Sequence, residues 1–186
     1  FHNSSHDTWN TIDMVSVVHE SVDRCILCES LNAHALKQEV SLWKCHDCGL
    51  IFDNPRPTQA SIQDYYSQEG KYQSFLDAAG MRKPFWLRIL RRLQKYKPGG
   101  NLLEIGAGVG DFLMYAQEYY AVDGTEISDE AIRVAKNRHN INLVQGEIEE
   151  LDFGEKRFDV IMLSHVLEHF PYPGRTLKRC IELLKP

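Results

Sequence analysis

The stretch LLEIGAGVGDF, residues 102–112, joins a short apolar run to a glycine-rich turn. The apolar run is typical of a buried strand, and Gly106, Gly108 and Gly110 let the backbone approach a ligand closely. From this point on, short apolar runs alternate with helical patterns. Such alternation predicts an α/β fold with a doubly wound parallel sheet, in which the glycine turn lies at the carboxyl edge where ligands bind.

The periodicity of the chain predicts the individual elements. Strands are expected at 101–105, 120–126, 142–146 and 158–164, and helices at 109–119, 128–139 and 174–185. Another helix is expected within 81–100, with Pro84 in its first turn and Pro98 at its stop. A shorter helix should follow Thr58, because threonine caps helix N-termini. The two helices that precede the sheet are therefore expected to connect it to the N-terminal part.

The glycine turn does not have the spacing of a dinucleotide site. The pattern G-x-G-x-x-G would place its third glycine at position 111, where the chain has Asp111. Glu104 and Asp111 flank the turn, and two carboxylates would oppose the attraction of a helix N-terminus for pyrophosphate. An NAD-dependent oxidoreductase is thus disfavoured. S-adenosylmethionine suits the turn better because it carries no phosphate and has two cationic groups, an ammonium and a sulfonium.

Several segments, in order, resemble the motifs of class I S-adenosylmethionine-dependent methyltransferases. The turn is similar to their first motif, an acid two residues before G-x-G-x-G. VDGTEIS at 122–128, VQGEIEELDF at 144–153, FDVIMLSHVLEHFPYP at 158–173 and TLKRCIELLKP at 176–186 resemble the later ones. The resemblance implies a Rossmann-like sheet with strand order 3-2-1-4. It also implies a domain that continues into a fifth strand and an antiparallel pair, so we expect this one to be incomplete at its C-terminus.

The resemblance also implies a set of cofactor-binding residues. Glu126 would hold both ribose hydroxyls, as a carboxylate can accept two hydrogen bonds from a diol. Glu147 would meet the adenine amino group, and the Ile148 amide an adenine ring nitrogen. The full set is Glu104, Gly106, Ala107, Gly108, Gly110, Glu126, Ile127, Glu147, Ile148 and Ser164.

Two histidines and a group of tyrosines are candidates for roles around the reacting methyl group. His165 and His169 follow the fourth predicted strand, and either could act as a base with a pKa in the working range. Both could instead only cap or pack that turn. Tyr65, Tyr66 and Tyr72 could line the methionine end of the cofactor, but for at least two of them an apolar contact between the N-terminal module and the domain is favoured.

Four cysteines in two C-x-x-C pairs predict a metal centre. Cys25, Cys28, Cys45 and Cys48 have the spacing of a structural zinc site. Four thiolate ligands leave no open position for water, so the role would be in folding. Two disulfides or four free thiols are the alternatives, and the first is disfavoured in a reducing compartment. His34 and His46 are nearby substitutes for a ligand and are favoured as bystanders.

The composition divides the chain of 186 residues into four parts. We expect a flexible terminus at 1–20, a zinc-ribbon-like module at 21–54, a helical linker at 55–100 and the incomplete methyltransferase domain at 101–186. The net charge of −5 argues against a broad nucleic-acid surface. No run resembles a membrane helix or the apolar core of a signal peptide, so a cytoplasmic location without a membrane partner is expected.

The whole layout resembles bacterial methyltransferases of the sugar and cell-surface polysaccharide type, with WKCHDCGLIFDNPRPT at 43–58 as a shared phrase. This resemblance implies a small-molecule acceptor, a sugar or nucleotide sugar. An rRNA base methyltransferase with a zinc module is the alternative, which the slightly acidic segment 21–54 disfavours. A protein that binds the cofactor without transferring its methyl group is another. The sequence leaves open the acceptor atom and homodimerisation.

Overall fold

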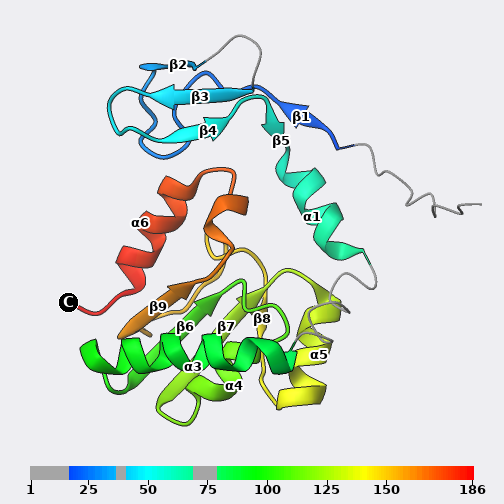
Figure 1. Ribbon diagram of the computed structural model, residues 1–186, viewed down its shortest axis with the longest axis vertical. Helices are drawn as coiled ribbons and strands as arrows, with labels where there is room; N and C mark the ends of the chain where they lie inside the picture. Colours follow the sequence, from blue (N-terminus) through cyan, green and yellow to red (C-terminus); the bar gives the residue numbers. More distant parts are fainter. Residues whose placement is uncertain (1–16, 37–40, 69–78) are drawn as a thin grey trace, which may run out of the picture.

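The structure, a computed structural model of the chain, describes residues 17–36, 41–68 and 79–186. Most of the terminus expected to be flexible, 1–20, lies outside these residues, and so does Tyr72. A small N-terminal module lies above α6, which covers one part of the α/β domain, and helix α1 runs from the module toward that domain (Figure 1).

The α/β domain is built on four parallel strands. They are β6 (Gly100–Ile105), β7 (Tyr120–Glu126), β8 (Val144–Gln145) and β9 (Val160–Leu163). Their order in the sheet is β8-β7-β6-β9, so the first strand of the domain lies in the interior and the chain winds outward to both sides. The order 3-2-1-4 implied by the resemblance is therefore confirmed.

Helices cover both faces of this sheet. They are α3 (Ala79–Tyr96), α4 (Asp111–Ala116), α5 (Asp129–His139) and α6 (Pro173–Leu183). Neighbouring residues of a strand point to opposite faces. Accordingly, buried Leu102 packs with residues of α3, α4 and α5, whereas buried Leu103 packs with residues of α6. The predicted doubly wound Rossmann-like architecture is confirmed.

Helix α3 starts earlier than predicted and ends just before Pro98, where its stop was expected. It begins at Ala79, so Pro84 lies inside the helix and not in its first turn. Proline has no amide hydrogen to donate to the preceding turn, but buried Leu90 and the apolar stripe around it anchor the helix to the core. The helix ends at Tyr96, and Gly100 already belongs to β6. Within the described ranges no helix, α3 included, is long and apolar enough to cross a membrane.

The N-terminal module consists of two small antiparallel sheets. One contains β2 (Ala33–Ala35), β3 (Leu42–Cys45) and β4 (Ile51–Asp53), and the other pairs β1 (His19–Glu20) with β5 (Arg56–Pro57). The second pairing extends the module beyond the predicted range 21–54 on both sides. The side chain of Asn54 joins the beginning and the end of the module, since it accepts a hydrogen bond from the Val22 amide and donates one to the Val22 carbonyl.

The module is connected to the domain through α1 and through the start of α6. Helix α1 (Gln59–Ser67) begins as predicted after Thr58, whose hydroxyl accepts a hydrogen bond from the Ser61 amide. At the other contact, a Cβ atom on Gly174 would overlap the Leu27 carbonyl oxygen. The backbone of the module therefore approaches α6 so closely that only glycine fits there.

Candidate cofactor site

A cavity of about 730 Å³ lies at the carboxyl ends of the parallel strands. The glycine turn after β6, the end of β7 and the segments that follow β8 and β9 line it, and α1 and α3 close its sides. Its volume is in the range of small-molecule sites, and its place is where a sheet of this topology binds ligands. Every residue predicted to bind the cofactor lines this cavity, except Gly110.

The three glycines of the turn have different roles. All adopt positive φ angles, which favour glycine. A Cβ atom on Gly106 would lie 2.5 Å from Val166 Cγ2, so the turn and the segment after β9 touch at this point. Gly110 is the N-cap of α4, and a Cβ there would lie 3.2 Å from Ala135 Cβ. Gly110 does not line the cavity, and its lack of a side chain lets α4 pack closely against α5, so its contact with the cofactor stays a prediction.

Glu126 is fixed at the end of β7 by backbone amides. Its two carboxylate oxygens accept hydrogen bonds from Gly108 at 2.8 Å, Ile127 at 2.8 Å and Ser128 at 3.0 Å. The bond to Gly108 joins the acid directly to the glycine turn, although the two are 18 residues apart in the sequence. The carboxylate therefore has a single orientation at the edge of the cavity.

Glu104 is a buried acid in the wall of the cavity. Its Oε2 has no hydrogen-bond partner among the described residues. Burial raises its pKa well above the ordinary value, and the nearby charges of Glu126 and Asp111 add to this. An unpartnered carboxyl oxygen facing a cavity in such surroundings is suited to a cationic group of a ligand.

Glu104→Gln should stabilise the ligand-free protein, and the gain should grow with pH. Burial raises the pKa of Glu104 in the folded state, so the folded protein keeps this proton at a pH where the unfolded chain has lost it. The free energy of unfolding therefore falls as the pH rises above the unfolded pKa of about 4.5. Below that value both states are protonated and the difference disappears. At pH 8 we expect a gain of about 1–3 kcal/mol in the free energy of unfolding. Urea unfolding at pH 8 and at a pH below about 4.5 measures this gain, and the exposed Glu118→Gln is the control. An equal gain at both pH values would contradict this assignment.

Asp111 is not a free negative charge beside the glycine turn, as its place in the sequence suggested. Arg82 Nη2 lies 2.6 Å from one of its carboxylate oxygens, and His139 Nε2 lies 3.1 Å from the other. Arg82 comes from α3 and His139 from α5, so no local motif marks either contact. Of the lysines and arginines that the structure describes, Arg82 alone lines the cavity. It faces a wall that contains five acids, Glu104, Asp111, Glu126, Glu147 and Glu168.

Helix α1 closes the side of the cavity near Glu147. Gln59 Nε2 donates to one carboxylate oxygen of Glu147 at 2.5 Å, and Gln63 Nε2 donates to the other at 2.6 Å. The two glutamines are four residues apart, which places them on the same face of the helix. This spacing was visible in the sequence, but without a known partner it did not indicate a site.

The two candidate bases differ in their surroundings. The His169 ring is partly buried, with Nε2 3.2 Å from the Tyr66 hydroxyl, and both residues line the cavity. Burial raises the pKa of Tyr66. The His165 side chain is 83% exposed, and its nearest acid, Glu168, is 4.0 Å away. Only a single turn of 3-10 helix, Leu167–His169, forms here, so the two histidines do not share a helix face.

The four cysteines of the module come together as predicted. Their sulfur atoms lie within 4.8 Å of one another, with Cys25 to Cys48 and Cys28 to Cys45 both at 3.6 Å. All four are unbonded thiols, which argues against the disulfide alternative. Zinc–sulfur bonds of about 2.3 Å place tetrahedral ligands about 3.8 Å apart, close to these separations.

The groups beside the four cysteines are also compatible with a metal site. The backbone amide of Cys48 lowers the pKa of Cys45 to about 7, which favours its thiolate form, whereas burial and the neighbouring thiols raise the pKa values of Cys28 and Cys48. His34 and His46 are outside the group of potential ligands, and their rings face each other with centroids 5.6 Å apart. The predicted bystander role of these histidines agrees with this arrangement.

The fold and the place of the cavity define a class I methyltransferase domain. Residues 78–186 match the family described as a methyltransferase domain. The chain belongs to this methyltransferase family.

Curated relatives include enzymes named for quinone biosynthesis. The ubiquinone biosynthesis O-methyltransferase of Coxiella burnetii is 34% identical over 125 residues, which cover 61% of this chain and 53% of that protein. The ubiquinone/menaquinone biosynthesis C-methyltransferase UbiE of Ectopseudomonas mendocina is 25% identical over 134 residues, which cover 66% of this chain and 52% of that protein. The chain thus spans about half the length of these relatives.

Solved structures show the same fold. The plantazolicin methyltransferase BpumL, in complex with a pentazolic desmethylPZN analogue and SAH, has a TM-score of 0.54 at 22% identity, covering 68% of this chain and 54% of that one. The magnesium protoporphyrin IX methyltransferase of Synechocystis PCC 6803, with bound SAM, has a TM-score of 0.53 at 16% identity, covering 68% and 72%. At these identities the likeness shows the fold alone.

Proposed function

We propose that the chain binds S-adenosylmethionine in this cavity and transfers its methyl group to a small-molecule acceptor. The observation that carries the proposal is Glu104, a buried acid with an unpartnered oxygen in the cavity wall beside the glycine turn. A phosphate would gain no cationic partner from Glu104, whereas a cationic group would favour the ionised form of this acid and pair with it. Membership of the methyltransferase family and the quinone methyltransferase relatives support the same function.

Each part of the cofactor has a complementary group in the cavity. Glu104 would bind the ammonium, and Arg82 would bind the carboxylate of the methionine end. Glu126, held by three backbone amides, would accept hydrogen bonds from the ribose hydroxyls. Glu147 and the Ile148 amide would bind adenine, with the glutamines of α1 closing that side of the cavity. When bound, the cofactor supplies an electrophilic methyl group.

His169 is favoured over His165 as the base that takes the proton of the acceptor. Both histidines line the cavity, but His169 is partly buried and its ring is fixed by the bond to the Tyr66 hydroxyl. His165 is too exposed for its orientation to be held by packing. Tyr66 lines the cavity, as one of the two roles offered for the tyrosines requires. For most of the tyrosines the other role, an apolar contact between module and domain, was favoured.

The acceptor is proposed from the walls of the cavity. The predicted sugar acceptor gains no support from the relatives, whose names refer to ubiquinone and menaquinone biosynthesis. The cavity is lined by large apolar side chains, including Phe85, Trp86 and Phe170. Sugar hydroxyls buried against such side chains would lose hydrogen bonds to water. A flat, largely apolar ring is therefore favoured as the acceptor.

The proposed zinc site has a separate role in folding. Four cysteine thiolates would complete a tetrahedral site without an open position, so the metal would hold the module together and take no part in methyl transfer. The buried thiols of Cys25 and Cys45 pack against Ala33 and Phe52, and this small cluster is the only buried core that the module has among its described residues. A core of this size needs additional stabilisation, which a bound metal would provide.

Calorimetric titration of the chain with S-adenosylhomocysteine, and with NADH in parallel, tests the proposed function. We expect binding of the first ligand and none of the second. NADH binding alone, or no binding of S-adenosylhomocysteine by well-folded protein, would overturn the proposal. Transfer of a labelled methyl group then distinguishes an enzyme from a protein that only binds the cofactor.

In the methyl-transfer assay His169→Asn should lower the rate about a hundredfold with unchanged cofactor affinity. His165→Asn should leave the rate unchanged.

A further inference from the structure

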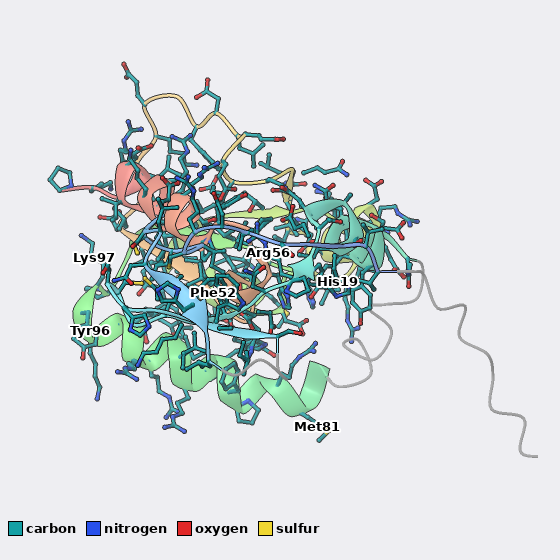
Figure 2. The ribbon with its side chains drawn as sticks, turned by 90° about the horizontal axis from the view of Figure 1, so that it is seen from above. His19, Phe52, Arg56, Met81, Tyr96 and Lys97 are labelled. Atoms are coloured by element: carbon teal, nitrogen blue, oxygen red, sulfur yellow. The ribbon has the colours of Figure 1, made fainter. Side chains whose placement is uncertain are left out.

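Helix α3 carries a concentrated positive charge. Its 18 residues include six lysines and arginines and no aspartate or glutamate, although the chain has a net charge of −5. The inner side of the helix packs on the sheet through buried Leu90 and its apolar neighbours. Figure 2 shows α3 along one edge of the molecule, with many nitrogen-tipped side chains pointing away from the body.

Four of these cations form a continuous outer face. Arg88, Arg91, Arg92 and Lys95 are all exposed, and none forms an ion pair with a residue that the structure describes. Their spacing of three and four residues places them on the same side of the helix. The charge of Arg82, by contrast, is directed inward to Asp111. The outer face is therefore free to meet a negatively charged surface.

Large apolar side chains are exposed among these cations. Met81 is 84% exposed, Phe85 45% and Tyr96 80%. At 100° per residue all three lie on the solvent side of the helix, with Arg88 and Arg92 between them. Figure 2 shows Met81 and Tyr96 near opposite ends of α3. The outer face thus combines charge with apolar side chains that no described residue buries, and of these Phe85 also lines the cavity.

We propose that the outer face of α3 binds a membrane surface with anionic headgroups. The cations match the headgroup charge, and the methionine and aromatic side chains can enter the boundary below it. Nucleic acid would use the charge but would leave Met81 without an apolar partner. The expectation of no membrane partner depended on the lack of a long apolar run, which a helix lying flat on a membrane does not need.

Helix α3 also forms part of the cavity wall. Arg82, Phe85 and Trp86, near the N-terminal end of the helix, line the cavity. A membrane in contact with the outer face would therefore lie next to the α3 wall of the cavity. This goes beyond the proposed function, because membrane binding requires neither cofactor nor methyl transfer.

Vesicle flotation with the full chain tests the inference. We expect binding to vesicles of phosphatidylcholine mixed with phosphatidylglycerol, little binding to phosphatidylcholine alone, and a loss of binding at high salt. Replacing Arg88, Arg91, Arg92 and Lys95 together by Gln should weaken binding at least about tenfold. Met81→Ser combined with Tyr96→Ser should weaken it severalfold without changing the charge.

A matched charge variant keeps the test specific. Replacing Arg133, Lys136, Arg138 and Lys178 by Gln removes the same charge from exposed positions on α5 and α6. This control should float like the unmodified protein. Equal losses in both variants, binding that ignores the lipid charge, or displacement of the protein from vesicles by duplex DNA would overturn the inference. Circular dichroism confirms that each variant is folded.

Discussion

Gly106→Val should abolish binding of S-adenosylhomocysteine, with a loss of at least about a hundredfold in affinity, or roughly 2.7 kcal/mol. The residue has a φ angle of 65°, which a β-branched side chain adopts only under strain. Its Cβ would also lie 2.5 Å from Val166 Cγ2. Either the turn or the segment after β9 must move, and both form the wall of the cavity.

The control for this variant separates loss of the site from loss of stability. Gly154 has a similar φ of 55°, yet its Cβ would meet no atom within 4 Å, and the residue does not line the cavity. Gly154→Val should therefore strain the backbone to a similar extent and leave ligand binding intact. Calorimetry and thermal melting of both variants measure the two effects. Unchanged affinity in Gly106→Val, or equal losses in both, would show that the cofactor binds elsewhere.

Much of the domain could be predicted because its patterns are local. The strand 100–105 alternates its buried side chains between two faces, and Ser128 caps α5 through the amide of Ala131. The glycine turn, Glu104 and Glu126 follow from their positions at strand ends, which the topology brings to one edge. The family resemblance supplied the strand order, and nine of the ten predicted cofactor residues line the cavity, although they are a minority of its lining residues.

The remaining features depend on contacts between distant parts of the chain. The partners of Asp111 are 28 and 29 residues away in sequence, and the glutamines of α1 meet Glu147 across more than 80 residues. No local pattern records such pairs. The same holds for the pairing of β1 with β5, which extended the module beyond its predicted boundaries. Gly110 belonged to the right motif, but the motif does not say whether a glycine serves a ligand or the packing of helices.

The N-terminal module and the cavity are physically connected. Arg56 pairs with Glu20 at 2.9 Å, donates to the Pro171 carbonyl and stacks on the Tyr172 ring at 4.7 Å. Pro171 lines the cavity two residues after His169. The segment that carries the proposed base is thus held from the module side. A module that loses its fold should release this segment, even though no cysteine contacts the cavity.

Cys45→Ser should therefore remove the metal and also weaken cofactor binding. Cys45 is fully buried at the centre of the small core of the module, and the cluster has no spare cysteine to replace it. We expect purified protein to contain about one zinc ion per chain and the variant to contain little, because structural zinc supplies much of the folding free energy of such modules. Affinity for S-adenosylhomocysteine should fall about tenfold, or roughly 1.4 kcal/mol, as the contacts of Arg56 are lost.

Elemental analysis and calorimetry measure both quantities, and Cys180→Ser is the matched control. Cys180 is also buried, but it lies in α6 among the core residues of the domain and outside the cluster. Its substitution should cost some stability and leave the zinc content unchanged. Full zinc content in Cys45→Ser would contradict the four-cysteine site. Loss of zinc with unchanged affinity would show that Arg56 holds the Pro171 segment without help from the metal, which would contradict the predicted link between metal binding and the cavity.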